Sequence, residues 1–272
     1  MKNGRLSNIA LILMLVVGLS LLLYPSFSDY WNSMHQTRAI ASYAEYVQTL
    51  DSNQYADIWN AAVNYNIGLL NRENEYALSA DQKKSYEQIL NMSGDGIMGF
   101  IEIPTIDVKL PIYHGTDESV LQVAIGHLEW TSLPVGGEST HCVISGHRGL
   151  PSARLFTDLD KMGVGDVFML HVLNQEMTYQ VDQVKIVLPH ETEDLLIVEG
   201  EDYCTLVTCT PYGVNSHRML VRGKRIDNLA QDQIVHVTAD AVIVEKLVVA
   251  PFILAPILLI MLIILMIPKR KK

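Results

Sequence analysis

The chain has 272 residues, enough for one substantial domain with accessory segments, and its hydrophobic fraction is 49%. Six of its 20 Lys and Arg residues lie in the two apolar end regions, which contain no acid. The region between them therefore carries 14 bases against 30 acids, a formal charge of −16. So acidic a region excludes a nucleic-acid-binding protein and gains no affinity from anionic lipid.

The first apolar segment, residues 9–24, carries no charge and follows Lys2 and Arg5. A membrane-spanning helix needs about 20 such residues, so this segment is slightly short. We interpret residues 1–28 as an uncleaved membrane anchor. The alternative is a signal peptide, for which residues 26–28 form an imperfect small-x-small cleavage site.

Residues 29–95 are predicted to be mainly helical, because apolar and aromatic side chains recur at steps of three and four residues. Residues 71–84 are polar and turn-rich. Within them, Ser79 is a plausible N-cap for a short helix that runs to Leu90. The NMSGDG stretch at residues 91–96 then marks a domain boundary.

Beyond this boundary the sequence changes to short β-like runs separated by Gly, Pro, Asp and Asn. The predicted strands are IMGFIEI, VKLPIY, HCVIS, DVFMLHV, MTYQVDQVKIVL, YCTLVTC and RMLVRGKRI. A hairpin is expected across residues 173–176. Strands this short and this closely spaced predict a mostly β domain over residues 96–227, either a closed barrel or a sandwich.

Residues 228–246 are interpreted as a tether that leads back to the membrane. The next 21 residues, 247–267, carry no charge and are long enough to cross a bilayer as a helix, and the basic tail 268–272 follows. Basic residues flank the outer end of each apolar segment. Because positive charge stays on the cytoplasmic side, both termini are expected in the cytoplasm and the domain between them outside the cell.

An odd number of cysteines leaves at least one free thiol in an extracellular domain. Cys142 lies five residues before His147, and Cys204 lies five before Cys209. If their strands pair in parallel and in register, the two earlier cysteines are neighbours on one face, while His147 and Cys209 meet on the other. We favour two buried thiols over a disulfide, which is awkward between adjacent strands. The cysteine and histidine spacings disfavour zinc, so no metal is expected.

A catalytic thiol needs a partner that makes it a thiolate and a donor for the oxyanion. Cys209 stands at a predicted strand end, and His147 lies on a tight turn in the motif SGHRG. Arg218 begins the next strand, where its guanidinium could bind a carbonyl oxygen or an oxyanion. A cysteine and a distant histidine are a weak signal by themselves. Their order with Arg218 and these turn residues is a better one.

At this point the sequence resembles a known family. TLVTC at residues 205–209 is similar to the active-site strand of the sortases, membrane-anchored cysteine transpeptidases of Gram-positive bacteria. SGHRGLPSA and TPYGVNSHR resemble the class C, or pilin-polymerising, branch. The resemblance runs almost continuously over residues 96–226, and the C-terminal span is consistent with it.

Carried over by position, the resemblance implies that Cys209 is the nucleophile, His147 its proton partner and Arg218 the clamp for substrate and oxyanion. It implies an eight-stranded sortase β-barrel without a cofactor, preceded by a helical or lid segment and flanked by two transmembrane helices. The implied reaction cleaves an LPxTG-like sorting signal through a thioester and joins it to a pilin lysine by an isopeptide bond. The alternative acceptor is a peptidoglycan amine, as in a housekeeping sortase that anchors surface proteins.

The sequence departs from class C enzymes in the lid, which often carries an Asp-Pro-aromatic signature over the cysteine. No Asp-Pro pair is present, but residues 71–84 occupy the expected place, and Glu75 and Tyr76 offer an acid beside an aromatic ring. We hypothesise that Tyr76 covers Cys209 while Glu75 or a neighbouring acid approaches Arg218. The alternative is a solvated loop in which Tyr76 packs locally.

Overall fold

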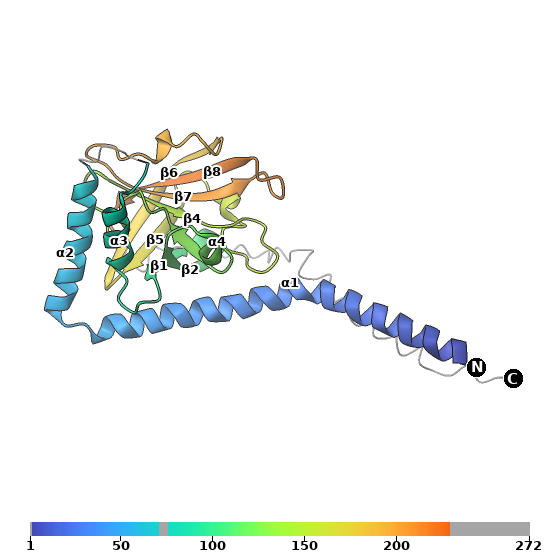
Figure 1. Cartoon of the computed structure of the whole chain (residues 1–272). Helices are drawn as coiled ribbons and strands as arrows, with labels where there is room; N and C mark the ends of the chain where they lie inside the picture. The colour runs from blue at the N-terminus through green and yellow to red at the C-terminus, as the bar shows by residue number, and fades with distance from the viewer. Residues whose placement is uncertain (1, 71–75, 229–272) are drawn as a thin grey trace. The chain divides into compact units, whose positions relative to one another are not determined.

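A computed structural model describes residues 2–70 and 76–228 (Figure 1). The chain divides into two units, one comprising residues 1–31 with 238–272 and the other residues 32–237. The C-terminal helix predicted at residues 247–267 lies outside the described residues, as do its basic tail and nearly all of the predicted tether.

The N-terminal apolar segment is part of one long helix, α1, which extends over Lys2–Thr49 and contains Pro25. In the described part of the chain, α1 is the one helix that is long and apolar enough to cross a membrane. It continues past residue 28, where the sequence analysis ended the anchor, because residues 26–49 contain no proline or glycine that would interrupt it.

Two shorter helices follow, α2 over Ser52–Leu69 and α3 over Ala80–Gln88. Each begins with a capping box, in which Asp51 and Ser79 accept hydrogen bonds from the first turn of the helix. The cap at Ser79 confirms the predicted start of the short helix, which ends slightly before the predicted Leu90.

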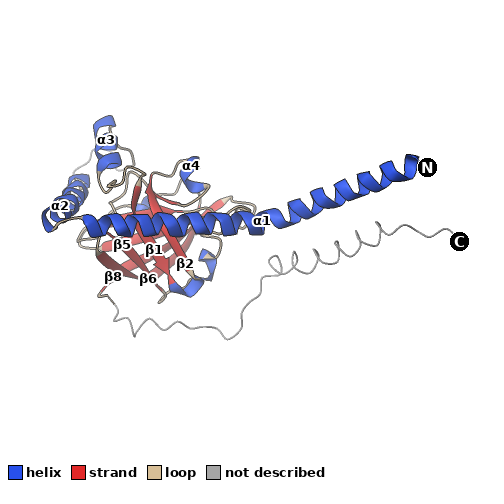
Figure 2. Cartoon of the chain, turned by 90° about the horizontal axis from the view of Figure 1, so that it is seen from below, coloured by secondary structure: helices blue, strands red, loops and turns tan. Residues whose placement is uncertain are grey.

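Eight strands close into a barrel in the order β1-β2-β3-β4-β7-β8-β6-β5 (Figures 1 and 2). Their bounds are Ile97–Ile103, Val108–His114, Ile125–His127, Thr140–Ser145, Val167–Val172, Gln175–Val187, Asp202–Thr210 and His217–Ile226. The seven predicted strands and the β5–β6 hairpin are confirmed. Of the two predicted architectures, barrel and sandwich, the structure is a barrel. β3 escaped prediction because three residues show no readable alternation.

Alternation along β4, β7 and β8 separates two apolar clusters. The barrel interior receives Cys142, Ile144, Cys204, Leu206, Met219 and Val221. Val143, Val207 and Leu220 point outward from these strands and form the outer cluster with Val187 at the end of β6 and Leu195 in the turn before β7, and Leu128 and Trp130 pack against it.

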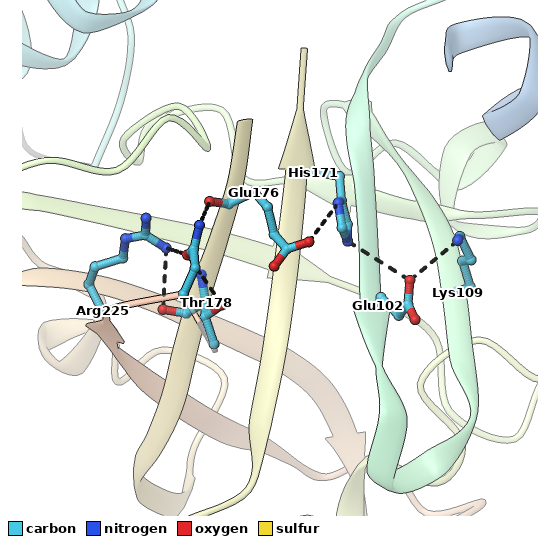
Figure 3. A network of polar contacts seen from close by, with 7 residues as sticks. Glu102, Lys109, His171, Glu176, Thr178 and Arg225 are labelled. Carbon is cyan, nitrogen blue, oxygen red and sulfur yellow. Dashed lines mark hydrogen bonds and ion pairs between the residues drawn. The ribbon is translucent and has the colours of Figure 1, made fainter. Parts of the chain in front are cut away.

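The outer face of β2, β1, β5 and the first residues of β6 carries a network of polar side chains (Figure 3). Lys109 pairs with Glu102 at 3.3 Å, and the ring of His171 lies within 3.9 Å of Glu102 and 3.8 Å of Glu176. Burial lowers the pKa of His171. Such partly exposed ion pairs contribute little to stability. This polar face contrasts with the apolar outer cluster on β4, β7 and β8.

The side chain of Tyr43 fastens α1 to the barrel. Its hydroxyl donates to the carbonyl oxygen of Met98 at 3.0 Å and accepts from the backbone N–H of Leu173 at 2.7 Å. Leu173 lies in the β5–β6 turn, where its φ is +55°. Tyr43 is 3% exposed, and this burial raises its pKa to about 12. One hydroxyl therefore satisfies two backbone groups from two strand regions.

Replacing Tyr43 with Phe should lower the free energy of unfolding by about 1–3 kcal/mol, because a donor and an acceptor stay buried without partners. Tyr46→Phe is the matched control, since Tyr46 lies one turn later on α1 and is 39% exposed; its effect should stay within about 0.5 kcal/mol. Urea unfolding of the purified chain measures both. Equal stabilities for the two variants would contradict this role for Tyr43.

Candidate active site

The parallel pairing of β4 with β7 has the predicted register, with Cys142 directly opposite Cys204. Both thiols are free and buried, as expected, and burial raises the pKa of Cys204 well above its usual value. Cys209, near the end of β7, is only half-buried. An offset of five residues along a strand reverses the face, so Cys209 points to the outside of the barrel.

His147 follows β4 at the same end of the barrel. The backbone pairing continues past the strand, because the N–H of Gly146 donates to the carbonyl oxygen of Val207 at 3.0 Å. The hydroxyl of Thr208 donates to the carbonyl oxygen of Gly146 at 2.8 Å. One further residue in this register would set His147 beside Cys209, as predicted.

Arg218 lies on the other side of the cysteine. β7 and β8 pair antiparallel, and Cys209 is directly opposite Arg218. Such cross-strand neighbours have Cβ atoms about 5 Å apart on one face of the sheet. The nine-residue spacing is therefore that of a hairpin with an exposed loop. The guanidinium of Arg218 donates to the carbonyl oxygens of Asn215 at 3.2 Å and His217 at 3.1 Å, which holds it at the base of that loop.

The loops that follow β4 and β7 are held together by residues that the sequence analysis did not single out. Arg148 donates to the hydroxyl of Thr210 at 3.3 Å and forms an ion pair with Asp160. Gly149 has φ +75°, and a Cβ there would lie 2.8 Å from the ring of Tyr212. Arg148 was visible in SGHRG, but its partners are distant in sequence, so no local pattern could reveal them.

Two buried histidines have structural roles. The Nδ1–H of His141 donates to the carbonyl oxygen of Leu196 at 2.8 Å, and its Nε2 accepts from the hydroxyl of Thr205 at 2.7 Å. Burial lowers the pKa of His141 to about 4, which keeps it neutral as this pattern requires. His127 is fully buried and hydrogen-bonds to Tyr86 at 3.1 Å.

Tyr76, proposed for the lid, packs edge-on against Trp130 with ring centroids 5.5 Å apart. Trp130 rests on the outer cluster, which includes Val207. Val207 is two residues from Cys209 and on the same face of β7. Tyr76 therefore belongs to the surface that leads to Cys209. Glu75 lies outside the described residues.

A cavity of about 370 Å³ adjoins the outer cluster and is lined partly by Leu69, Trp130, His141, Leu195 and Ile197. In the described residues, no group of three or more His, Cys, Asp or Glu side chains could hold a metal ion. What the arrangement offers instead is a half-buried thiol directly opposite an arginine on the neighbouring strand, with a histidine in the loop that follows the other neighbouring strand. These groups suffice for nucleophilic acyl transfer.

Comparison with known proteins agrees with this chemistry. Residues 101–226 match the sortase domain family. Sortase D of Bacillus subtilis is 30% identical over 151 residues, which cover 54% of this chain and 73% of that protein. Among solved structures, sortase C1 of Streptococcus agalactiae is 52% identical with a TM-score of 0.69, covering 71% of this chain and all of that one.

A second solved structure, sortase C of Streptococcus pneumoniae, is 47% identical with a TM-score of 0.64. That structure provides insights into catalysis and pilin substrate specificity. That alignment covers 71% of this chain and 98% of the other. Together with the barrel topology, these sequence and structural matches show that the chain belongs to the sortase family of cysteine transpeptidases.

Proposed function

We propose that this sortase is a pilin polymerase with Cys209 as nucleophile, His147 as proton carrier and Arg218 as oxyanion clamp. The observation that carries the assignment of roles is the cross-strand pair of Cys209 and Arg218. Two solved relatives named sortase C, at 52% and 47% identity, favour the class C reaction over wall anchoring.

In the first half-reaction, the Cys209 thiolate attacks the carbonyl carbon of the threonine in an LPxTG-like sorting signal. Arg218 stabilises the negative charge on the oxygen, and this is worth most in a site that excludes water. The C–N bond then breaks, His147 gives its proton to the departing amine, and a thioester remains on Cys209. The thioester conserves the free energy of the cleaved peptide bond.

In the second half-reaction, a lysine amine of the next pilin attacks the thioester carbonyl. His147, neutral after the first step, takes a proton from the attacking nitrogen, and the C–S bond breaks to release the Cys209 thiolate. An isopeptide bond forms and the thiolate–imidazolium pair is restored. Exclusion of water from the site lets the amine compete with hydrolysis. A peptidoglycan amine is the alternative acceptor.

The sorting signal fits the outer face of β4 and β7. Four residues of extended peptide span about 13 Å, the length of the four-residue step from Cys209 back to Thr205. This path crosses Val207 of the outer cluster and reaches the level of His141, which lines the cavity of about 370 Å³. Apolar residues at the start of the signal would bury against this surface.

Tyr76 and its neighbours form a lid over this path. Because Tyr76 packs on Trp130, and Trp130 on the outer cluster, the lid competes with the sorting signal for the same apolar surface. An acid of the same segment, such as Glu75, would compete for Arg218. The lid therefore limits access until a substrate displaces it.

The membrane positions the enzyme next to its substrates. The apolar part of α1 anchors the chain, and the segment at residues 247–267 provides a second span. With both termini in the cytoplasm, the barrel lies on the outer surface, where surface proteins and pilins emerge.

The three roles predict distinct losses when a sorting-signal peptide is incubated with the chain and the acyl-enzyme is followed by mass spectrometry. Cys209→Ala should form none. His147→Ala and Arg218→Ala should slow acylation about 100-fold or more, because each removes proton transfer or oxyanion stabilisation. His190→Ala, at an exposed histidine, is the control and should acylate normally. Normal acylation in the His147 or Arg218 variant would refute that residue's role.

The lid predicts that Tyr76→Ala cleaves a sorting-signal peptide about 2–10 times faster than the unmodified chain, since it loses an aromatic contact. Tyr76→Phe keeps the ring and should behave like the unmodified chain. Initial rates with a quenched fluorescent peptide measure the effect. If Tyr76→Ala leaves both the rate of peptide cleavage and the rate of thiol alkylation unchanged, Tyr76 does not cover a surface that the substrate needs.

A further inference from the structure

A second cavity, of about 440 Å³, adjoins the catalytic histidine away from the outer cluster. One wall is α4, over Glu118–Leu121, with the residues beside it, and the opposite wall is the loop after β4 that carries His147. Asn215, from the hairpin loop between Cys209 and Arg218, completes the lining. The cavity shares no residue with the outer cluster, so it stays open when a sorting signal occupies that face.

The charged side chains that line this cavity differ in whether they already pair with an opposite charge. Arg148 is nine-tenths buried and already engaged by Asp160 and Thr210. Glu118 is exposed and accepts a hydrogen bond from the neutral amide of Gln122 at 3.3 Å, which leaves its negative charge uncompensated. Of the residues that line the cavity, Glu118 is the one acid. The cavity therefore suits a cation with an extended apolar stem.

Helix α1 is hydrogen-bonded to both walls of the cavity. The amide of Gln36 donates to the carbonyl oxygen of Val123, just after α4, at 2.7 Å. One turn earlier, Asn32 donates to the carbonyl oxygen of Ser152, in the loop after β4, also at 2.7 Å. Residues four apart lie on one face of a helix, so a single face of α1 hydrogen-bonds to both walls and fixes the distance between them. Figure 2 shows α4 near α1.

Building on the pilin-polymerase function, we propose that this cavity binds the acceptor lysine, with Glu118 recruiting its ε-ammonium group. A lysine side chain is an apolar stem with a compact cationic end, which matches one carboxylate in a cavity lined also by Leu121 and Leu150. The cavity leads to His147, so the acceptor approaches the thioester from the side opposite the sorting signal.

The protons balance in this arrangement. The bound ammonium loses one proton to solvent, and the free amine attacks the thioester. Its nitrogen then gives a second proton to His147 as the C–S bond breaks and the thiolate leaves. At the other end of the cavity, beside His147, Arg148 is already paired with Asp160, so the carboxylate of Asp160 is not available to an ammonium group. The ammonium group therefore binds at Glu118, and the free amine reaches His147.

The test separates the two half-reactions in the full chain in detergent. The acyl-enzyme is formed with a sorting-signal peptide and then resolved with either Nα-acetyl-lysine methylamide or hydroxylamine, which is uncharged at neutral pH. Glu118→Gln should raise the KM for the lysine probe about fivefold, the effect of losing one partly exposed charge pair. Acylation and release by hydroxylamine should stay within about twofold, because neither uses the carboxylate.

Two variants serve as controls. Glu118→Asp keeps the charge and should retain most of the affinity for the lysine probe. Glu138→Gln removes an exposed carboxylate that does not line the cavity and should leave every rate unchanged.

An unchanged KM in Glu118→Gln would overturn the inference, as would an equal loss in acylation and in both release reactions. If the unmodified acyl-enzyme is released by hydroxylamine but not by the lysine probe, the pilin-polymerase function itself fails and the inference falls with it.

Discussion

The in-register parallel pairing of β4 with β7 is the constraint on which the active site depends. It sets Cys142 against Cys204 inside the barrel and continues to Ser145 and Val207, two residues before His147 and Cys209, so the proposed pair depends on the same register. A slip of one residue would turn every side chain of one strand to the opposite face. The buried thiol pair therefore marks the strand register on which the proposed pair of His147 and Cys209 depends, although the proposed chemistry makes no use of these two thiols.

The hairpin of β7 and β8 brings Arg218, the proposed oxyanion clamp, opposite Cys209 at little entropic cost. Because Arg218 is opposite Cys209 in the ladder, backbone hydrogen bonds fix their separation and only a short loop has to close. The loop's own position depends on contacts with the histidine loop, through Arg148 and through Tyr212 packed on Gly149. Of the three proposed catalytic groups, Cys209 and Arg218 thus come from paired strand ends and His147 from the loop after β4, and the loops around them contact each other.

Most of the barrel strands and the register of β4 with β7 could be predicted from the sequence, for reasons that are local, whereas the roles of Cys209, His147 and Arg218 came from the family resemblance. Period-two alternation marks strands, and a constant offset of five residues marks two strands that end together. What escaped prediction is non-local or too short. β3 has only three residues, and Arg148 finds its partners at Thr210 and Asp160. No pattern within SGHRG encodes that contact, since its partner atoms are fixed by the closure of the barrel.

The two proposed binding surfaces would let one thiol serve two substrates in order. The apolar outer cluster suits an uncharged extended peptide, and the cavity beside Glu118 suits a cationic side chain. In the proposed mechanism both routes end at Cys209 and His147, so the acceptor can bind before the cleaved peptide leaves. A single shared groove would force the acceptor to wait for the cleaved peptide to depart and would admit water to the thioester. Separate approaches let the lysine be in place when the thioester forms, which is the arrangement that favours transfer over hydrolysis.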